Sequence, residues 1–328
     1  MIIAEAGVNH NGRLDLALEL CDAAKASGAD VVKFQTWITE ALITRNVKCA
    51  DYQRDNTGSD ADQFEMLKEL ELSQDDFRVI KKYCDDIGIL FASTADEKES
   101  LDFLIEIGIP FVKVGSGDIG NTPYLRYIGS KGLPVILSTG MSTIDDVKNS
   151  LNAIKEGGDV DVTLLHCTTN YPCPYEQANV KAMVTLKDAF SVPVGFSDHT
   201  MGKEASLLAV SLGACVIEKH FTLSRDMKGP DHVASMEPNE FADMVKSIRI
   251  LEQCMGDGQK KPTRDEKEIS KVVIKRIVAY KPIKKNEVFS EENICIKRCD
   301  EGMKASEWDS IIGIKATREY NKDEGIRL

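Results

Sequence analysis

The sequence predicts an α/β protein built as a (β/α)8 barrel and followed by a small β-rich domain. The first observation is a series of eight short segments, rich in β-branched and aromatic residues and bounded by glycine or proline. They are IIAEA (2–6), VVKFQ (31–35), ILFAST (89–94), FVKVGS (111–116), PVILST (134–139), VTLLHC (162–167), PVGFSD (193–198) and CVIEKHF (215–221). The second observation is that amphipathic stretches of helical length separate most of these segments, as at 15–30 and 202–214, and a last one follows at 237–256.

The order of these elements favours a closed parallel barrel. Strands that alternate with helices pair in parallel through right-handed crossovers. Eight such units in about 255 residues match the strand count of a TIM barrel. A doubly wound open sheet is the alternative, and it is disfavoured because no G-x-G-x-x-G follows the first strand.

The character of the chain changes near residue 258. We expect a barrel domain over 1–258, a polar linker over 259–271 and a β-rich domain over 272–328, where strand-like segments alternate with turns. So short a domain buries little apolar surface by itself. We therefore expect it to pack on the barrel or on a second chain.

Composition excludes several classes of protein. The net charge of −12 argues against a nucleic-acid partner, because the phosphate backbone would be repelled. The nine cysteines contain no C-x-x-C pair, which is typical of a reduced, cytoplasmic protein. There is neither a signal peptide at the start nor a run of 18 apolar residues, so we expect no secretion and no membrane span.

Polar residues gather at the predicted strand ends, the place where barrel enzymes carry their active sites. The strand starts, in contrast, are apolar. The polar residues at the ends are Glu5, Lys33, Gln35, Thr94, Lys113, Ser116, Ser138, Thr168, Asp198, His199, Lys219 and His220. Because parallel strand ends meet on one face, they predict a single site.

The residue types at this face suggest a chemistry. His199 and His220 end neighbouring strands and could share a divalent metal ion, although each could instead bond a nearby backbone group. Lys33 and Lys113, with the hydroxyls of Thr94, Ser116 and Ser138, suit a phosphate or carboxylate; a Lys–Glu ion pair is the alternative. Glu5 could act as a base or pair with Lys33, and the two roles are compatible.

These features predict a metal-assisted barrel enzyme that acts on a small anionic compound. A rival enzyme reading is a Schiff-base aldolase that uses Lys33, Lys113 or Lys219. A non-enzyme alternative is a carbohydrate-binding or scaffold protein whose C-terminal domain performs the recognition.

Eight motifs in order carry a resemblance to a known family: IIAEAGVNHNG, VKFQT, KVGSGDI, ILSTGM, HCTTNYPCP, GFSDHT, ACVIEKHFT and GPDHVAS. Over essentially its whole length the chain resembles the sialic acid synthase family of nonulosonate synthases. From about residue 272 it resembles that family's antifreeze-like (SAF) domain, a β-clip fold. The resemblance implies condensation of phosphoenolpyruvate with an N-acetylated amino-hexose and water, with release of phosphate. The product would be N-acetylneuraminate or its relatives legionaminate and pseudaminate.

The resemblance also implies roles for particular residues. His199 and His220 would bind manganese or magnesium, and Glu5 would handle a proton. Arg298 would reach the N-acetyl group in the partner subunit's site, which implies a domain-swapped homodimer. Phosphoenolpyruvate would be held by Lys33, Thr94, Lys113, Ser116, Ser138 and Ser197, and the amino sugar by Gln35, Tyr171 and Asp231.

Some positions depart from the family pattern. Asp118, a candidate catalytic carboxylate, stands where the family often has glutamate, and CDEGM follows Arg298 where Pro-Gly-x-Gly-Ile is usual. The CTT motif at 167–169 and the DYQ segment at 51–53 are closer to the legionaminate branch. His232 has no role that the sequence defines.

Overall fold

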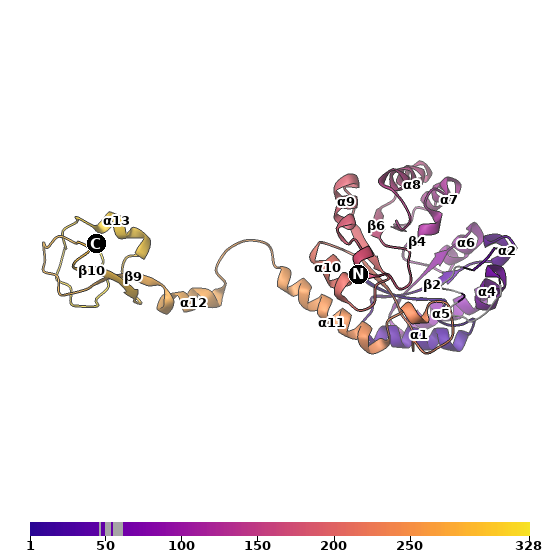
Figure 1. Cartoon of the computed structure of the whole chain (residues 1–328), viewed down its shortest axis with the longest axis horizontal. Helices are drawn as coiled ribbons and strands as arrows, with labels where there is room; N and C mark the ends of the chain where they lie inside the picture. Colours follow the sequence, from indigo (N-terminus) through magenta and orange to yellow (C-terminus); the bar gives the residue numbers. More distant parts are fainter. Residues whose placement is uncertain (46, 50–53, 55–61) are drawn as a thin grey trace. The chain divides into compact units, whose positions relative to one another are not determined.

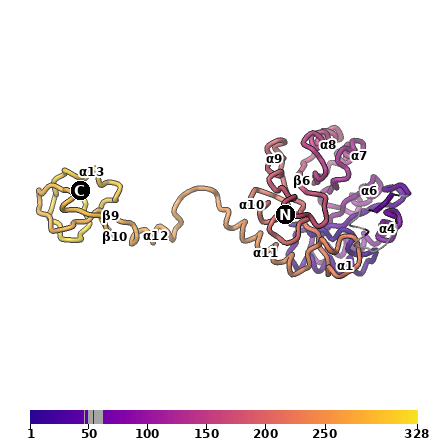
Figure 2. The backbone as a smooth tube through the Cα atoms, viewed as in Figure 1, coloured from indigo at the N-terminus to yellow at the C-terminus, as the bar shows by residue number. Residues whose placement is uncertain are grey.

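The computed structural model describes residues 1–45, 47–49, 54 and 62–328. The DYQ segment at 51–53 lies outside the described residues. The chain divides into two compact units, Met1–Gly256 and Asp257–Leu328 (Figures 1 and 2). Each unit is described by itself.

The first unit is a closed barrel of parallel strands in the order β1 to β8, so the predicted (β/α)8 barrel is confirmed. The register places Glu5 beside Lys33 on one side and beside His220 on the other. The strands are β1 Ile2–Gly7, β2 Val31–Thr36, β3 Leu90–Ala95, β4 Val112–Val114, β5 Val135–Ser138, β6 Val162–His166, β7 Val194–Asp198 and β8 Ile217–His220.

Helices cover the outside of the barrel, as the labels in Figure 1 show. Several begin with side-chain caps: Ser73 and Thr143, for example, form capping boxes with Asp76 and Asp146. The helices of this unit are α1 Leu14–Ala26, α2 Thr39–Leu42, α4 Gln63–Leu70, α5 Gln74–Ile87, α6 Lys98–Glu106, α7 Thr122–Gly129, α8 Ile144–Gly157, α9 Lys181–Phe190, α10 Glu204–Ser211 and α11 Pro238–Met255; short 3-10 turns are η1 Ser116–Asp118, η2 Tyr175–Gln177 and η3 His232–Ala234.

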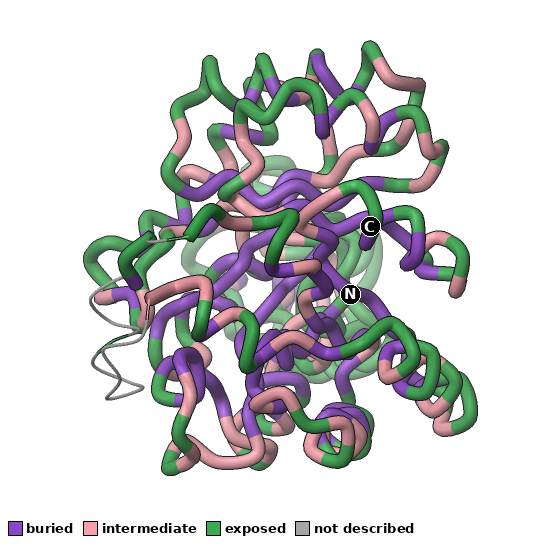
Figure 3. The backbone as a smooth tube through the Cα atoms, turned by 90° about the vertical axis from the view of Figure 1, so that its right-hand side faces the viewer, coloured by how far each residue is buried: buried purple, intermediate pink, exposed green. Residues whose placement is uncertain are grey.

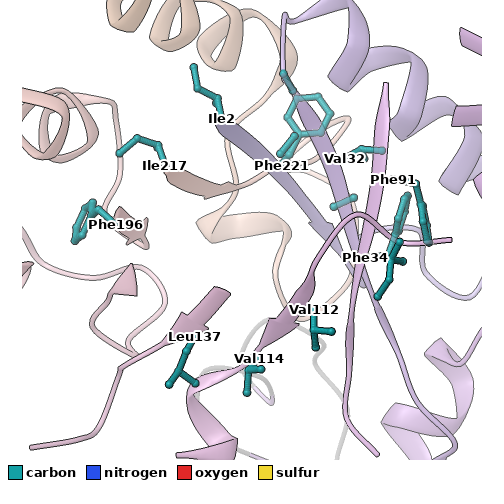
Figure 4. Packing of buried hydrophobic residues seen from close by; sticks show 14 of the residues in the cluster. Ile2, Val32, Phe34, Phe91, Val112, Val114, Leu137, Phe196, Ile217 and Phe221 are labelled. Atoms are coloured by element: carbon teal, nitrogen blue, oxygen red, sulfur yellow. The ribbon is translucent and has the colours of Figure 1, made fainter. Parts of the chain in front are cut away.

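Successive strand residues point alternately to the helices and into the barrel. On the helix side, Phe34 and Phe91 lie face to face with ring centroids 6.1 Å apart (Figure 4). The buried backbone runs through the barrel strands, while the outer turns are exposed (Figure 3). The outer helices and the apolar side chains packed beneath them therefore exclude water from the strands.

Inside the barrel, a separate apolar cluster fills the end away from the candidate site. Most of its members stand two positions before a polar residue of the same strand, which puts each pair on the same inward face. The pairs are Ile3 with Glu5, Val31 with Lys33, Ala92 with Thr94, Phe111 with Lys113, Ile136 with Ser138 and Val216 with Glu218. The polar residues thus rest on a closed apolar floor.

The second unit contains α12 Arg264–Val273, η4 Ala305–Glu307, α13 Trp308–Ile311 and the antiparallel pair β9 Lys275–Ala279 and β10 Ile294–Arg298. Much of the expected linker at 259–271 is the first part of a helix, which begins with a capping box at Thr263. The unit has a small apolar core of its own, and its packing on the barrel or on a second chain remains a prediction. The core consists of Ile277, Ala279, Ile283, Phe289, Ile294, Ile311, Ala316, Tyr320 and Ile326.

None of the helices in the described part of the chain is both long enough and apolar enough to cross a lipid bilayer.

Candidate active site

The strand ends surround a cavity of about 200 Å³ at the carboxyl-end face of the barrel, which we call the first cavity. Every strand, or the loop after it, contributes to its lining. Among the predicted residues, the lining includes Glu5, Lys33, Gln35, Thr94, Lys113, Ser116, Ser138, Tyr171, Ser197, His199 and His220. The structure therefore brings together residues that are as far as 215 positions apart in the chain, as Glu5 and His220 are.

Two buried lysines share a buried glutamate in the first cavity. Lys33 Nζ lies 2.6 Å from Glu5 Oε2 and 3.7 Å from Glu218 Oε2. Lys113 Nζ lies 3.4 Å from Glu218 Oε1. The lysines also donate hydrogen bonds to Thr94 Oγ1 at 3.0 Å and to Ser138 Oγ at 2.9 Å. The Lys–Glu pairing considered from the sequence is thus present, and the hydroxyls occupy the expected places.

The two glutamates have different proton affinities. Burial acts to raise the pKa of Glu218, but Lys113, Lys33 and the Ser197 hydroxyl outweigh it and lower that pKa to about 2. Burial raises the pKa of Glu5, and Lys33 offsets this only in part. Two carboxylates held apart in this way can take different roles. The surroundings thus favour the ionised form of Glu218 and, relative to an ordinary glutamate, the protonated form of Glu5.

The two histidines lie side by side at the ends of the neighbouring strands β7 and β8, with ring centroids 5.5 Å apart and ring planes at 63°. Tyr171 lies against His199 at a centroid distance of 4.2 Å. His199 Nδ1 lies 2.7 Å from the carbonyl oxygen of Thr168, so Nδ1 carries the hydrogen and Nε2 keeps its lone pair. Burial lowers the pKa of both rings, which keeps them in the neutral form that binds metals.

The donor set for a metal ion would include these two imidazoles. His220 Nδ1 is buried without a hydrogen bond and lies 3.8 Å from Asp231 Oδ2. In the part of the chain that is described, no group of three or more His, Cys, Asp or Glu side chains is placed to hold a metal. Two protein ligands would leave further positions to water or substrate.

A second cavity of about 210 Å³ adjoins the first, and both are lined by Gln35, Tyr171 and His220. Gln35 donates a hydrogen bond from Nε2 to Glu5 Oε1 at 3.1 Å, which joins the two sites. Asp231 also lines this cavity, and burial together with Glu5 raises its pKa to about 7. The rest of the lining is apolar and consists of Val8, Met66, Leu67, Leu70 and Pro230.

Four predicted residues of the barrel unit line neither cavity: Asp118, Thr168, Asp198 and Lys219. Asp118 accepts a hydrogen bond from Asn121 Nδ2 at 2.9 Å and does not line either cavity. Arg298 is exposed at the end of β10 in the second unit. Lys219, one of the aldolase candidates, points away from the first cavity; its Nζ lies 3.0 Å from Asp198 Oδ2 and donates to the Thr200 carbonyl.

Two carboxylates that the sequence analysis did not assign line the first cavity. Glu218 precedes His220 by two positions, so strand alternation places both side chains inward, and this signal could have identified it. Asp96 follows β3 directly, and burial together with Asp118 raises its pKa to about 7. Asp96 follows Thr94 by two positions, so alternation would place it inward as well, but it lies beyond the segment 89–94 that the sequence analysis predicted as a strand.

A closed (β/α)8 barrel with ion-paired lysines, a more basic glutamate and two neutral histidines at its strand ends defines the chain as a barrel enzyme. The chain belongs to the NeuB family, whose family model matches residues 20–260. It is 46% identical over 329 residues to the N,N'-diacetyllegionaminic acid synthase of Campylobacter jejuni, which spans 100% of this chain and 98% of that protein.

Two further relatives place the chain within the family. The pseudaminic acid synthase of Campylobacter jejuni is 33% identical over 327 residues, 99% of this chain and 95% of that protein. A crystal structure of the N-acetylneuraminic acid synthetase from Leptospira borgpetersenii, in complex with citrate, is 34% identical with a TM-score of 0.73; the match covers 82% of this chain and 89% of that one.

Proposed function

We propose that this chain condenses phosphoenolpyruvate with an N-acetylated amino-hexose and water, giving a sialic-type (nonulosonic) acid and phosphate. The observation that carries the proposal is one buried cavity in which two lysines and two histidines converge, in a chain of the NeuB family. The higher identity to a diacetyllegionaminic acid synthase than to a pseudaminic acid synthase supports N,N'-diacetyllegionaminate as the product. N-acetylneuraminate is the second candidate.

The first cavity suits phosphoenolpyruvate. Lys33 and Lys113 provide positive charge for its phosphate and carboxylate, and Thr94, Ser138 and Ser197 provide hydroxyl donors. Ser116 adds a further hydroxyl, whose oxygen accepts a hydrogen bond from the Gly140 N–H at 2.9 Å.

A divalent ion, Mn²⁺ or Mg²⁺, would be held by His199 and His220. Charge supports this assignment: Glu5 and Glu218 already balance the two lysines, so a multiply charged anion needs another cation. The neutral rings and the buried His220 Nδ1 without a hydrogen bond fit a metal ligand. When bound, the ion would polarise the aldehyde oxygen of the open-chain sugar.

The reaction forms one carbon–carbon bond and, from water, one carbon–oxygen bond, and it breaks the carbon–oxygen bond to phosphate. C3 of phosphoenolpyruvate attacks the aldehyde carbon, whose oxygen takes up a proton. Water adds to C2 and loses a proton, and phosphate leaves C2. Glu5 is the side chain proposed to accept the proton of that water, because burial raises its pKa above that of an ordinary glutamate. Glu218 stays ionised and holds Lys33 and Lys113 in place.

The second cavity suits the remainder of the amino sugar. Asp231, Gln35 and Tyr171 offer polar contacts on one side. The apolar wall from Met66, Leu70 and their neighbours would face groups without hydroxyls, such as the C6 methyl of a 2,4-diacetamido-6-deoxy sugar. This wall is the structural support for the legionaminate-type substrate.

The C-terminal unit is proposed to be an SAF domain that brings Arg298 to the site of a second copy in a domain-swapped homodimer. The exposure of Arg298 is compatible with this role. A reducing cytoplasmic location is proposed from the cysteines: Cys21 and Cys84 have sulfur atoms 3.5 Å apart in the core and form no disulfide.

A Schiff-base aldolase is the main competing reaction. It needs an uncharged lysine in the cavity. Burial acts to lower the pKa of Lys33, but Glu218 and Glu5 outweigh it and raise that pKa. Lys219 points away from the cavity. Both observations favour the metal-assisted reaction.

The test is phosphate release from phosphoenolpyruvate with 2,4-diacetamido-2,4,6-trideoxymannose or N-acetylmannosamine. We expect turnover that needs both substrates, disappears after dialysis against EDTA and returns with Mn²⁺ or Mg²⁺. Turnover that persists in chelator contradicts the metal assignment. Covalent trapping of substrate by borohydride would instead identify the aldolase.

A further inference from the structure

The segment Asn9–Gly12, in the motif GVNHNG, is unusually buried for a loop after a strand. Asn9 is 1% exposed and His10 is 0% exposed. It forms a tight turn in which Asn11 and Gly12 have φ of 51° and 70°. None of its four residues lines the first or the second cavity, so direct contact with substrate does not explain it.

One side of this turn is fastened to the loop after β8. Asn9 Nδ2 donates to the Phe221 carbonyl and to Ser235 Oγ, both at 2.9 Å. Ser235 Oγ in turn donates to the Asp231 carbonyl at 2.7 Å. The backbone of Asp231 is therefore two hydrogen bonds away from Asn9.

His232 provides a second attachment. Its ring is fully buried, and burial lowers its pKa to about 4, so it is neutral at pH 7. A neutral ring has one donor and one acceptor. Nε2 lies 3.1 Å from Asn11 Oδ1 and donates to it; Nδ1 lies 2.7 Å from Thr222 Oγ1 and accepts from that hydroxyl. Both ring nitrogens are used within the loops, which leaves neither for substrate.

On its other side the turn approaches α4 closely at Gly12, beside a cavity of about 280 Å³ that Asn11 lines together with residues of α4 and of the loop after β8. A Cβ on Gly12 would lie 2.3 Å from the Glu69 carbonyl oxygen. A Cβ on Gly229, in the loop after β8, would lie 2.7 Å from Asn11 Oδ1 and 2.7 Å from His232 Cδ2. Only glycine permits these two approaches.

The turn thus contacts both elements that wall the second cavity. The loop after β8 supplies Pro230 and Asp231, and α4 supplies Met66, Leu67 and Leu70. These two walls are more than 150 residues apart in the sequence. We propose that the turn Asn9–Gly12, together with His232, is a positioning element that sets the spacing of the two walls and thereby the affinity for the amino sugar, without touching it. This inference rests on the proposed function for the identity of the ligand.

Kinetics of the full-length enzyme separate this role from general destabilisation. In His232→Ala we expect the KM for the amino sugar to rise about tenfold, the size of a lost hydrogen bond of ~1.4 kcal/mol. The KM for phosphoenolpyruvate should stay within about twofold, because strand residues hold that half of the site. Gly12→Ala acts on the side of the turn that faces α4. It should likewise raise the KM for the amino sugar and leave the KM for phosphoenolpyruvate almost unchanged.

Ser27→Ala is the matched control. It removes a part-buried hydroxyl that lies 2.8 Å from the Ala23 carbonyl oxygen and 3.1 Å from the Pro238 carbonyl oxygen, where α1 meets α11 away from the turn. It should leave both KM values unchanged. If His232→Ala and Gly12→Ala raise both KM values equally, or neither, the positioning role is overturned.

Hydrogen–deuterium exchange gives a readout that needs no activity. In His232→Gln, a milder variant, exchange should increase at both 63–70 and 223–237 and stay unchanged in the second unit. An increase in only one of the two segments overturns the proposal. Suppose that exchange increases in the variant as expected, but the wild-type chain shows no turnover of phosphoenolpyruvate with either sugar. The proposed function then fails and the positioning role stands.

Discussion

The two adjoining cavities are built in different ways. The lysines and glutamates that line the first are all on barrel strands, whose spacing the hydrogen-bonded register fixes, and the apolar cluster inside the barrel forms the floor beneath them. The second is lined largely by α4 and by the loop after β8. Strand residues suit steps that need fixed geometry, while loops and helices can vary without disturbing the barrel. The difference indicates that the first cavity performs the chemistry and that the second selects the sugar.

The largest effect should follow from a change in the first cavity. Lys113→Ala removes one charge that the substrate anion needs, and it also removes a partner of Glu218. Phosphate release should fall by roughly 10²–10³-fold or more. Lys82→Ala, at an exposed pair with Asp86, is the control and should be fully active. If Lys113→Ala is nearly as active as the wild type, the chemical role proposed for this cavity is contradicted.

Glu218→Gln tests whether the first cavity is also a fixed electrostatic unit. The change leaves Lys113 and Lys33 without their shared carboxylate, and breaking a buried ion pair costs about 3–5 kcal/mol of unfolding free energy. Urea denaturation measures this loss. Glu156→Gln removes the exposed partner of Arg126 and should cost at most ~1 kcal/mol. Equal losses in the two variants would contradict the electrostatic account.

A change in the second cavity should alter selectivity more than rate. Leu70→Gln places an amide on the apolar wall. The ratio of kcat/KM for the diacetamido-6-deoxy sugar over N-acetylmannosamine should fall about tenfold, since hydrophobic pockets discriminate by roughly this factor for small groups. Leu70→Met keeps the wall apolar and should preserve the ratio. A ratio that is unchanged in Leu70→Gln would mean that this wall does not face the sugar.

The last prediction concerns the pH dependence of stability at Asp96. Burial and Asp118 raise its pKa to about 7 in the folded chain, above the usual value of an aspartate near 4. A raised carboxyl pKa stabilises the fold below pH 4, and this contribution disappears as the pH rises to 7. Asp96→Asn should therefore gain stability relative to wild type between pH 4 and pH 8, as thermal unfolding can measure. If the stability difference between Asp96→Asn and wild type stays constant across this pH range, the raised pKa of Asp96 is contradicted.

Strand periodicity made much of the first cavity predictable. Glu5, Lys33, Lys113, His199 and His220 end segments whose β-branched composition predicts strands, and parallel strands bring their ends to one face. Glu218 was missed although the same alternation places it inward. Asp118 was predicted as a catalytic residue from resemblance, and its carboxylate instead contacts Asn121 outside the cavities, so its catalytic role remains a prediction.

Residue alternation and strand order were enough to predict the barrel and the face on which its polar residues meet, because both are local properties that repeat along the chain. The ion pairs of those residues could not be predicted in this way: Glu218 pairs with both Lys33 and Lys113, and Lys219 points outward to Asp198. The second cavity, too, becomes visible only in the tertiary structure. Its walls come from α4 and the loop after β8, which are far apart in the sequence. Asn11, Gly12 and His232 connect them through close contacts in the folded chain, and such contacts leave no periodic pattern in the sequence.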